Sequence, residues 1–172
     1  YPYVHLTGTK RVGKSLTLKI VGELAFNALF SSSMSSAAAY RAVEACSTTL
    51  LLDEAENLQK KSKNEGQDDK IEILKAGYMK GPKAIRCSGD NHEPTGFDVY
   101  SPKMFGSIQA MDKILADRAI TLTLARKLRP IADLDFPAER ERMARTRDKL
   151  YVLQMEHAKD VWEEIRAGIN WE

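Results

Sequence analysis

Eight consecutive residues near the start of the chain have the types and the spacing needed to hold phosphate groups. The run Gly8-Thr9-Lys10-Arg11-Val12-Gly13-Lys14-Ser15 fits the phosphate-binding loop pattern G-x-x-x-x-G-K-[ST]. In such a loop the glycines allow a tight turn, and successive backbone N–H groups point inward. Lys14 is then the residue that reaches the β- and γ-phosphates, and the Ser15 hydroxyl is a ligand for Mg²⁺. The pattern predicts a site for Mg²⁺ and a nucleoside triphosphate. We expect ATP, although no base-reading motif separates it from GTP.

The segments on either side of this loop predict the elements that must position it. The run Tyr3-Val4-His5-Leu6-Thr7 is a short β-prone segment, and residues 16–30 carry apolar side chains at helical spacing. A strand, a glycine loop and a helix in this order place the positive end of the helix dipole at the phosphates.

Two acidic residues after a second apolar run would complete the site. Residues 48–52 have the composition of a buried parallel strand, and Asp53 and Glu54 follow it directly. Ligands bind at the carboxyl ends of such strands. We therefore expect Asp53 to hold the Mg²⁺ and Glu54 to polarise the water that attacks the γ-phosphate. Glu54 and Glu56 could instead be first-turn acids of a helix, where the dipole favours them, and the two roles are compatible.

Periodicity and turn residues predict the remaining elements. They are helices over 37–44 and 108–116, a helix that Asp68 caps and that ends at Gly81-Pro82, a β-hairpin with strands 83–88 and 97–100, a strand over 119–124, and a helix of about thirty residues from Pro137. Ser35 or Ser36 is the expected N-cap of the first of these helices. The order predicts an α/β fold with a mostly parallel central sheet, an inserted β-hairpin and a C-terminal helical segment.

Composition and charge narrow the class of protein. The 172 residues are 43% hydrophobic and 29% charged with a formal net charge of +2, as in a soluble chain that can bury a core. No apolar run approaches the roughly 20 residues that span a bilayer, and Cys46 and Cys87 give no disulfide framework. We therefore expect a cytoplasmic protein that contacts no membrane. Because the chain starts at Tyr1 and not at Met, we expect it to be a piece of a longer protein.

The motifs resemble those of the P-loop ATPases with an additional catalytic glutamate, the additional-strand group, and in particular the AAA+ group. More narrowly, the chain is similar to helicase-like ATPase domains encoded by phages, plasmids and other mobile elements, often beside a primase module. The resemblance covers about Val4 to Arg126. Its marks are Gly8 to Ser15, Thr49 to Glu54, Gly77 to Arg86, Ser101-Pro102-Lys103, and Leu115 to Arg118 followed by a strand.

The resemblance implies a fold and an assembly. The fold would be a three-layer P-loop NTPase sandwich over residues 1–130, and residues 131–172 would form a helical lid or a linker to a missing domain. Such ATPases assemble as rings with nucleotide between subunits, so Arg118 would be an arginine finger for the neighbour's γ-phosphate. The alternative is a surface pair of Asp117 with Arg118, or simply a charge at the end of the strand. The family also places a polar sensor on the strand that we expect to end at Lys103, which assigns Ser101 or Lys103 to the γ-phosphate.

A nucleic-acid partner, with DNA favoured, is implied by the hairpin. Related ATPases grip DNA or RNA in the ring pore with a hairpin in this position. The tip here, Asp90-Asn91-His92-Glu93, is acidic and would repel phosphates, whereas Lys80, Lys83 and Arg86 on its approach could contact them. A second group of cations lies on the predicted C-terminal helix and is either a solvated face or the source of a second sensor. It consists of Arg140, Arg142, Arg145 and Arg147.

The prediction that follows is a hydrolase in which Lys14, Glu54 and Arg118 cleave Mg²⁺–ATP to drive movement of, or on, nucleic acid. Two other functions stay open. The chain could be an ATP-dependent remodeller or loader of a protein partner, which single-stranded DNA would not stimulate. It could also be a regulatory switch that binds ATP and hydrolyses it negligibly, in which Glu54→Gln would alter little.

Overall fold

The computed structural model of the chain describes residues 3–53, 74–88, 93–108, 111, 113–126 and 136–168. The chain divides into two compact units, Tyr1–Ile131 and Ala132–Glu172, next to the boundary expected from the sequence. The elements of the first unit are β1 (Tyr3–Thr7), α1 (Lys14–Leu24), β2 (Ala28–Ser31), α2 (Ser36–Cys46), β3 (Thr49–Leu52), β4 (Lys83–Ser88), β5 (Glu93–Asp98), β6 (Lys103–Ser107), α4 (Lys113–Asp117) and β7 (Ala119–Thr123). The second unit contains α5 (Phe136–Gly168).

A five-stranded parallel sheet in the order β2-β3-β6-β1-β7 forms the centre of the first unit, so the prediction of an α/β fold with a parallel sheet is confirmed. The register brings the carboxyl ends of three adjacent strands level, because Thr7 of β1 lies opposite both Ser107 of β6 and Thr123 of β7. The residues that follow these strands therefore meet at one edge of the sheet.

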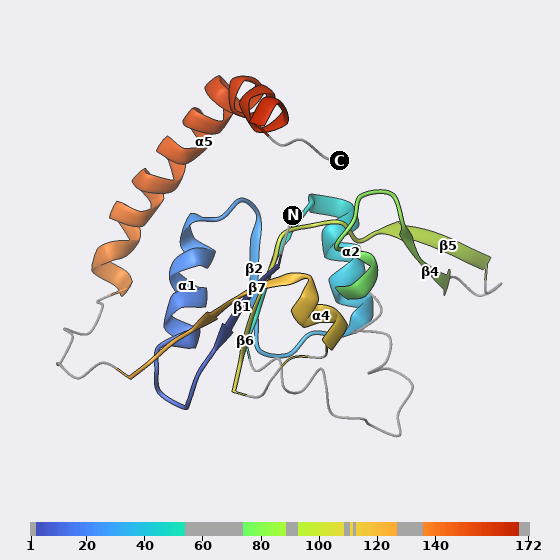
Figure 1. The fold of residues 1–172 in the computed structure, drawn as a ribbon, viewed down its shortest axis with the longest axis horizontal. Helices are drawn as coiled ribbons and strands as arrows, with labels where there is room; N and C mark the ends of the chain where they lie inside the picture. Colours follow the sequence, from blue (N-terminus) through green and yellow to red (C-terminus); the bar gives the residue numbers. More distant parts are fainter. Residues whose placement is uncertain are drawn as a thin grey trace. The chain divides into compact units, whose positions relative to one another are not determined.

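Helices cover both faces of this sheet (Figure 1). The chain runs from β1 through α1 to β2 at the edge of the sheet, and then returns in the opposite direction through α2 to β3. Because both connections are right-handed crossovers, their opposite directions place α1 and α2 on opposite faces of the sheet. On the α1 face, Leu18 packs with Leu6 and Leu51. On the other face the core cluster consists of Tyr3, Leu52, Leu74, Phe105 and Leu115.

The predicted β-hairpin is present as a separate two-stranded antiparallel sheet, β4 with β5. Its second strand begins at Glu93 and not at Phe97, because Pro94, Thr95 and Gly96 also pair across the hairpin. Phe97 packs against Tyr40 of α2 with ring centroids 4.3 Å apart, which anchors the hairpin to the helical layer. Of the predicted acidic tip, residues 90–92 lie outside the described residues.

The helix predicted over 16–30 is wrong at its second half, because α1 ends at Leu24 and the apolar residues beyond it form the edge strand β2. The chain leaves the helix at the extended C-cap Ala25, and Asn27 then turns in a left-handed conformation, with φ +43°, and donates from its side-chain Nδ2 to the carbonyl of Cys46 at 2.8 Å. The N-cap prediction for α2 is confirmed, because the Ser35 hydroxyl accepts from the Ala38 N–H at 3.1 Å.

The strand that we expected to end at Lys103 instead begins there, and β6 continues to Ser107. The helix expected over 108–116 is correspondingly shorter, since α4 spans only Lys113–Asp117. The sequence signal for β6 is weak because Met104 and Phe105 are its only large apolar residues.

The second unit contains the long helix that the sequence predicts, 33 residues from Phe136 to Gly168. Its amino-terminal arginines contact acidic neighbours on the helix surface, which favours the interpretation of a solvated face. The pairs are Arg142–Glu139 at 3.5 Å, Arg145–Glu141 at 3.6 Å and Arg147–Asp148 at 3.0 Å. Among the described helices, none combines the length and the apolar character that a membrane span requires.

Candidate nucleotide site

The loop between β1 and α1 has the backbone conformation that its glycines predict. Gly8 and Gly13 have φ values of +144° and +96°, in the region that L residues with side chains rarely adopt. A Cβ on Gly8 would lie 2.4 Å from the Leu124 carbonyl oxygen, just after β7. Glycine is therefore required at position 8 for both the turn and the close approach of the two strand ends.

The amino end of α1 is left open in a way that suits an anion. Its N-cap, Gly13, supplies no side-chain hydrogen bond, and its first turn contains no acidic residue. By contrast, the N-cap Ser35 of α2 does accept a backbone hydrogen bond. The first N–H groups of α1 and the positive end of its dipole are thus available to phosphate oxygens.

Lys14 folds back over the loop that precedes it. Its Nζ donates to the carbonyl oxygens of Gly8 at 2.8 Å and Thr9 at 2.9 Å. The ammonium group is therefore already held within the curve of the loop, next to the helix end. Ser15 is exposed one residue further on, as a metal ligand would have to be.

Asp53 is brought to the same place by β3. Its backbone N–H donates to Ser31 at 2.9 Å, which extends the β2–β3 pairing past the end of the strand. A Cβ built on Gly106 of β6 would lie 3.1 Å from Asp53 Oδ1 and 3.7 Å from Lys14 Cβ, so both side chains flank this glycine. The structure thus brings Lys14 and Asp53 together as the sequence predicts, whereas Glu54 lies outside the described residues.

The oxygen donors at this edge fit Mg²⁺. A hydroxyl from Ser15 and a carboxylate from Asp53 are the hard ligands that Mg²⁺ prefers, and the remaining positions are normally filled by water and phosphate oxygens. Within the described ranges no group of three or more His, Cys, Asp or Glu side chains could hold a metal ion by itself. A metal here would therefore need the phosphates of the nucleotide as partners.

The prediction that Ser101 or Lys103 contacts the γ-phosphate needs correction. Both lie at the amino end of β6, at the edge of the sheet opposite the loop, and both are buried. Lys103 Nζ donates to the carbonyls of Val99 at 2.8 Å and Ser101 at 3.2 Å, and lies 5.1 Å from the centre of the Tyr3 ring. Burial lowers the pKa of Lys103 to about 7, against the opposing attraction of Asp98. Lys103 is a structural residue of the core.

Arg118 also lies at the edge opposite the loop, immediately before β7. It does not pair with Asp117 as the alternative interpretation supposed. Its Nη1 donates to the carbonyl of Lys75 at 2.5 Å, and its guanidinium lies 5.5 Å from the centre of the Tyr78 ring. The hydroxyl of Tyr3 donates to the neighbouring carbonyl of Leu74 at 2.6 Å. Within this chain, Arg118 therefore contacts the helical residues 74–76, at the edge of the sheet away from the loop.

Sequence reasoning missed two residues of β6 near the loop. Gly106 has no side chain where Lys14 approaches the sheet, and Ser107 lies opposite Thr7 in register, next to the start of the loop. Ser107 is buried, and its hydroxyl lies 2.7 Å from Nε2 of His5 in β1. The direction of the strand could have identified them. Ligands bind at the carboxyl ends of parallel strands, so the last residues of each strand are the candidates for the site.

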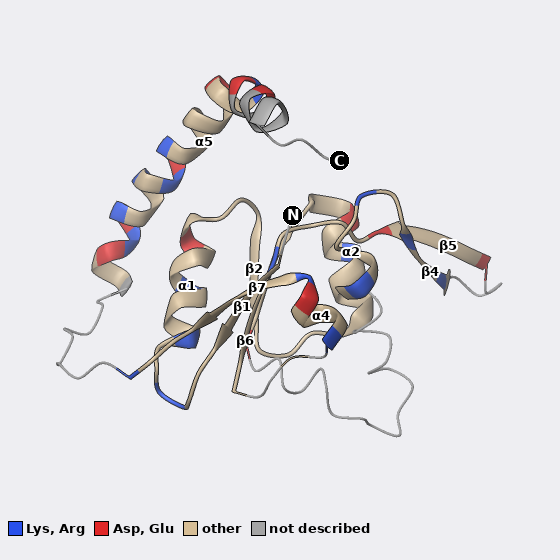
Figure 2. Cartoon of the chain, in the orientation of Figure 1, with Lys and Arg blue, Asp and Glu red and all other residues tan. Residues whose placement is uncertain are grey.

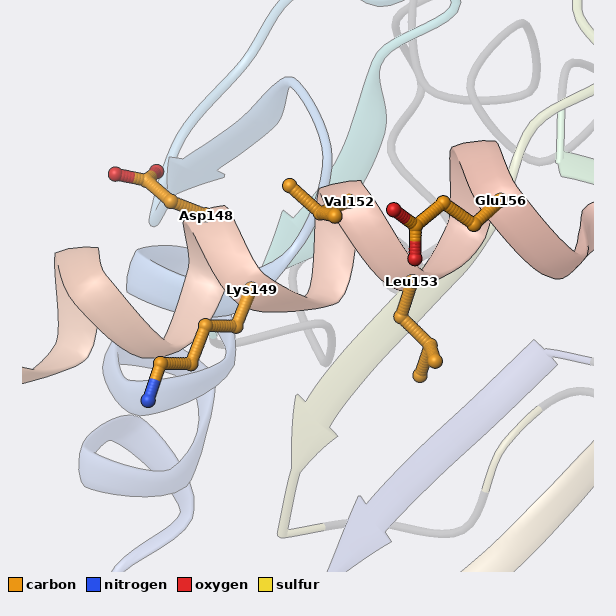
Figure 3. Close-up of a pocket in the computed structure, with 5 residues that line it drawn as sticks. All are labelled: Asp148, Lys149, Val152, Leu153 and Glu156. Carbon is orange, nitrogen blue, oxygen red and sulfur yellow. The ribbon is translucent and has the colours of Figure 1, made fainter.

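Figure 3 shows a pocket on α5 that is poorly suited to binding a nucleotide. Of the residues that the structure describes, those lining it are Asp148, Lys149, Val152, Leu153 and Glu156. They belong to successive turns of one helix and include two acids, which repel phosphate.

No protein-family model matches the chain, and no curated protein matches it either. The candidate site therefore rests on the geometry of the loop, α1, β3 and β6.

Proposed function

We propose that this chain is a Mg²⁺-dependent ATPase of the AAA+ type whose hydrolysis drives movement of, or on, nucleic acid. The observation that carries the proposal is that the side chains of Lys14 and Asp53 both lie against Gly106. They lie beside a loop in which Gly8 and Gly13 have positive φ. An ammonium, open helix N–H groups and a carboxylate at one sheet edge are the groups that a metal-bound triphosphate needs.

The strand order supports the same assignment. β6 lies between β1, which leads into the loop, and β3, which carries Asp53. Only this strand separates the one that leads into the loop from the one that carries Asp53, so the two parts of the proposed site lie close together.

Each residue has a defined part in the proposed reaction. The N–H groups of the loop and of α1 hold the β- and γ-phosphates, and Lys14 exchanges its bonds with Gly8 and Thr9 for bonds with phosphate oxygens. Ser15 and Asp53 would hold Mg²⁺, which when bound neutralises charge on the phosphates. Glu54 accepts a hydrogen bond from the water that attacks the γ-phosphorus. The bond from the γ-phosphorus to the bridging oxygen breaks, releasing ADP, phosphate and a proton.

The hairpin supports the nucleic-acid part of the proposal. Lys80 and Lys83 are exposed on its approach, and within the described ranges their side chains make no hydrogen bond or ion pair. Figure 2 shows cations at the start of the hairpin, which pairs with no strand of the central sheet. Unpaired cations on a protruding element are suited to phosphate backbones.

The experiment is ATP hydrolysis with Mg²⁺, with and without single-stranded DNA, at two salt concentrations. We expect DNA to stimulate turnover and the stimulation to fall steeply as salt increases. Lys83→Gln should weaken the stimulation while leaving the DNA-free rate unchanged. Hydrolysis that DNA leaves unaffected would contradict a nucleic-acid motor and favour a remodeller of proteins.

Two variants test the hydrolytic site itself. Lys14→Ala should lose nucleotide binding, because it removes the ammonium group that the carbonyls of Gly8 and Thr9 hold in the curve of the loop, where it can reach phosphate oxygens. Glu54→Gln should retain binding and reduce turnover by about three orders of magnitude or more. If Glu54→Gln changes nothing and the parent barely turns over, the chain is a nucleotide switch and not a motor.

A further inference from the structure

The phosphate loop contains a residue whose backbone conformation suits its side chain poorly. Arg11 has φ +64°, in the left-handed region that L residues with long side chains disfavour. The other non-glycine residues with positive φ in the described part of the chain are Asn27 and Ser47. Both are short polar residues at turns, and Ser47 ends α2 as its C-cap. Arg11 also lies in a turn, but its side chain is long and makes no hydrogen bond there among the described residues.

The side chain of Arg11 is also unused by the fold. It is exposed, and no hydrogen bond, ion pair or ring contact involves it within the described residues. The same is true of Lys10 beside it. Figure 2 shows these cations on the turn between β1 and α1, the turn that leads into Lys14. The arginines of α5, by contrast, contact acids of their own helix.

We propose that Arg11 is a further phosphate-contact residue, which makes the site prefer a nucleoside triphosphate over the diphosphate. The inference rests on the proposed function and deepens it. Strained residues persist where a site requires them, and an unpaired guanidinium binds phosphate oxygens without first breaking another bond. A triphosphate carries one more negative charge than a diphosphate, so an added cation in the loop strengthens its binding more.

The test compares Arg11→Gly and Arg11→Lys with the parent by calorimetric titration of two Mg²⁺ complexes, adenylyl imidodiphosphate and ADP. Arg11→Gly should weaken binding of the triphosphate analogue about tenfold and binding of ADP by no more than about threefold. Arg11→Lys should retain most of the preference because it keeps the charge. The melting temperature of Arg11→Gly should increase, since glycine adopts this φ without strain.

Lys19→Gln is the matched control, because Lys19 is exposed on α1, beyond the loop, and its loss changes the net charge equally. Its two dissociation constants should stay within about twofold of the parent's. If Arg11→Gly keeps the parent's ratio of the two constants, the inference is overturned. Lys14→Ala, titrated in the same series, separates this failure from that of the proposed function. Lost binding in Lys14→Ala leaves the ATPase proposal standing, whereas parental binding would overturn it.

Discussion

Gly8 shows how a single residue ties the loop to the sheet. Gly8 and Gly13 both have positive φ, but a Cβ on Gly8 would meet the backbone of Leu124, whereas one on Gly13 meets nothing within 4 Å. We expect Gly8→Ala to lower the free energy of unfolding by about 2 kcal/mol more than Gly13→Ala does. The clash also opens the hydrogen bond from Leu124 N–H to Thr7 at the end of β1. Urea unfolding of the two variants measures the difference, and equal losses would contradict the close approach.

The buried Lys103 makes the stability of the fold depend on pH. Its pKa is about 7 in the folded chain, whereas that of an exposed lysine is 10.5, so between these limits unfolding takes up a proton. Raising the pH through this window therefore stabilises the fold, by up to about 1.4 kcal/mol per pH unit, while below pH 7 the group adds no further dependence. We expect the parent to gain stability relative to Lys103→Met between pH 7 and pH 9. Chemical unfolding at several pH values measures this gain.

The matched control for this pH dependence is Lys83→Met, which removes an exposed lysine and should follow the parent at every pH. Parallel curves for the parent and Lys103→Met would show that Lys103 titrates normally. The sequence alone could not have predicted the burial of Lys103, because a lysine that follows Ser101 and Pro102 has the pattern of a strand end facing solvent. The loop residues, in contrast, could be predicted because their spacing is fixed by the turn itself.

Among the elements, the helical residues 74–76 depend on side chains from elsewhere to satisfy their last carbonyls. Arg118 donates to Lys75 and Tyr3 donates to Leu74. Burial raises the pKa of the Tyr3 hydroxyl, so it stays a donor. A cation near the carboxyl end of a helix is also favoured by the helix dipole. The same segment leads into β4, so this cap also holds the root of the hairpin.

We expect Arg118→Met to lower the free energy of unfolding by about 1–3 kcal/mol, because it removes the hydrogen bond to the Lys75 carbonyl and the contact with the Tyr78 ring. Arg126→Met is the control, since Arg126 is exposed and has no partner among the described residues. Its unfolding free energy should change by less than about 0.5 kcal/mol. An Arg118 variant as stable as the control would show that the cap contributes nothing measurable.

The elements also show where sequence patterns reach their limit. The parallel sheet, the hairpin and α5 could be predicted because their apolar periods are long or bounded by turn residues. β2 and β6 could not, because each is short and follows an ambiguous apolar run. The misplaced bounds of β6 changed the predicted site. Placing the strand end at Lys103 moved the candidate sensor to the wrong edge of the sheet, away from Ser107.

At the scale of the whole molecule, the two edges of the sheet separate the loop from Arg118. The loop follows the carboxyl end of β1, whereas Arg118 precedes the parallel β7. β7 contains five residues, which separates its ends by roughly 16 Å at about 3.3 Å per residue. An arginine at this edge does not serve the loop of its own subunit. If Arg118 contributes to hydrolysis, it does so at a neighbouring subunit's nucleotide, and the active form is an oligomer.

Mixing two inactive variants tests this arrangement. Lys14→Ala keeps Arg118 but loses the loop lysine, whereas Arg118→Gln keeps the loop but loses the arginine. In mixed rings the intact loop of one subunit can lie next to the intact arginine of another, and about a quarter of the sites would be complete at equal proportions. We expect hydrolysis to appear on mixing and to increase with total protein concentration. Folding of Arg118→Gln is checked first by its melting temperature, because the variant also loses the cap on Lys75. Activity no greater than the sum of the separate variants would mean that Arg118 is a cap only.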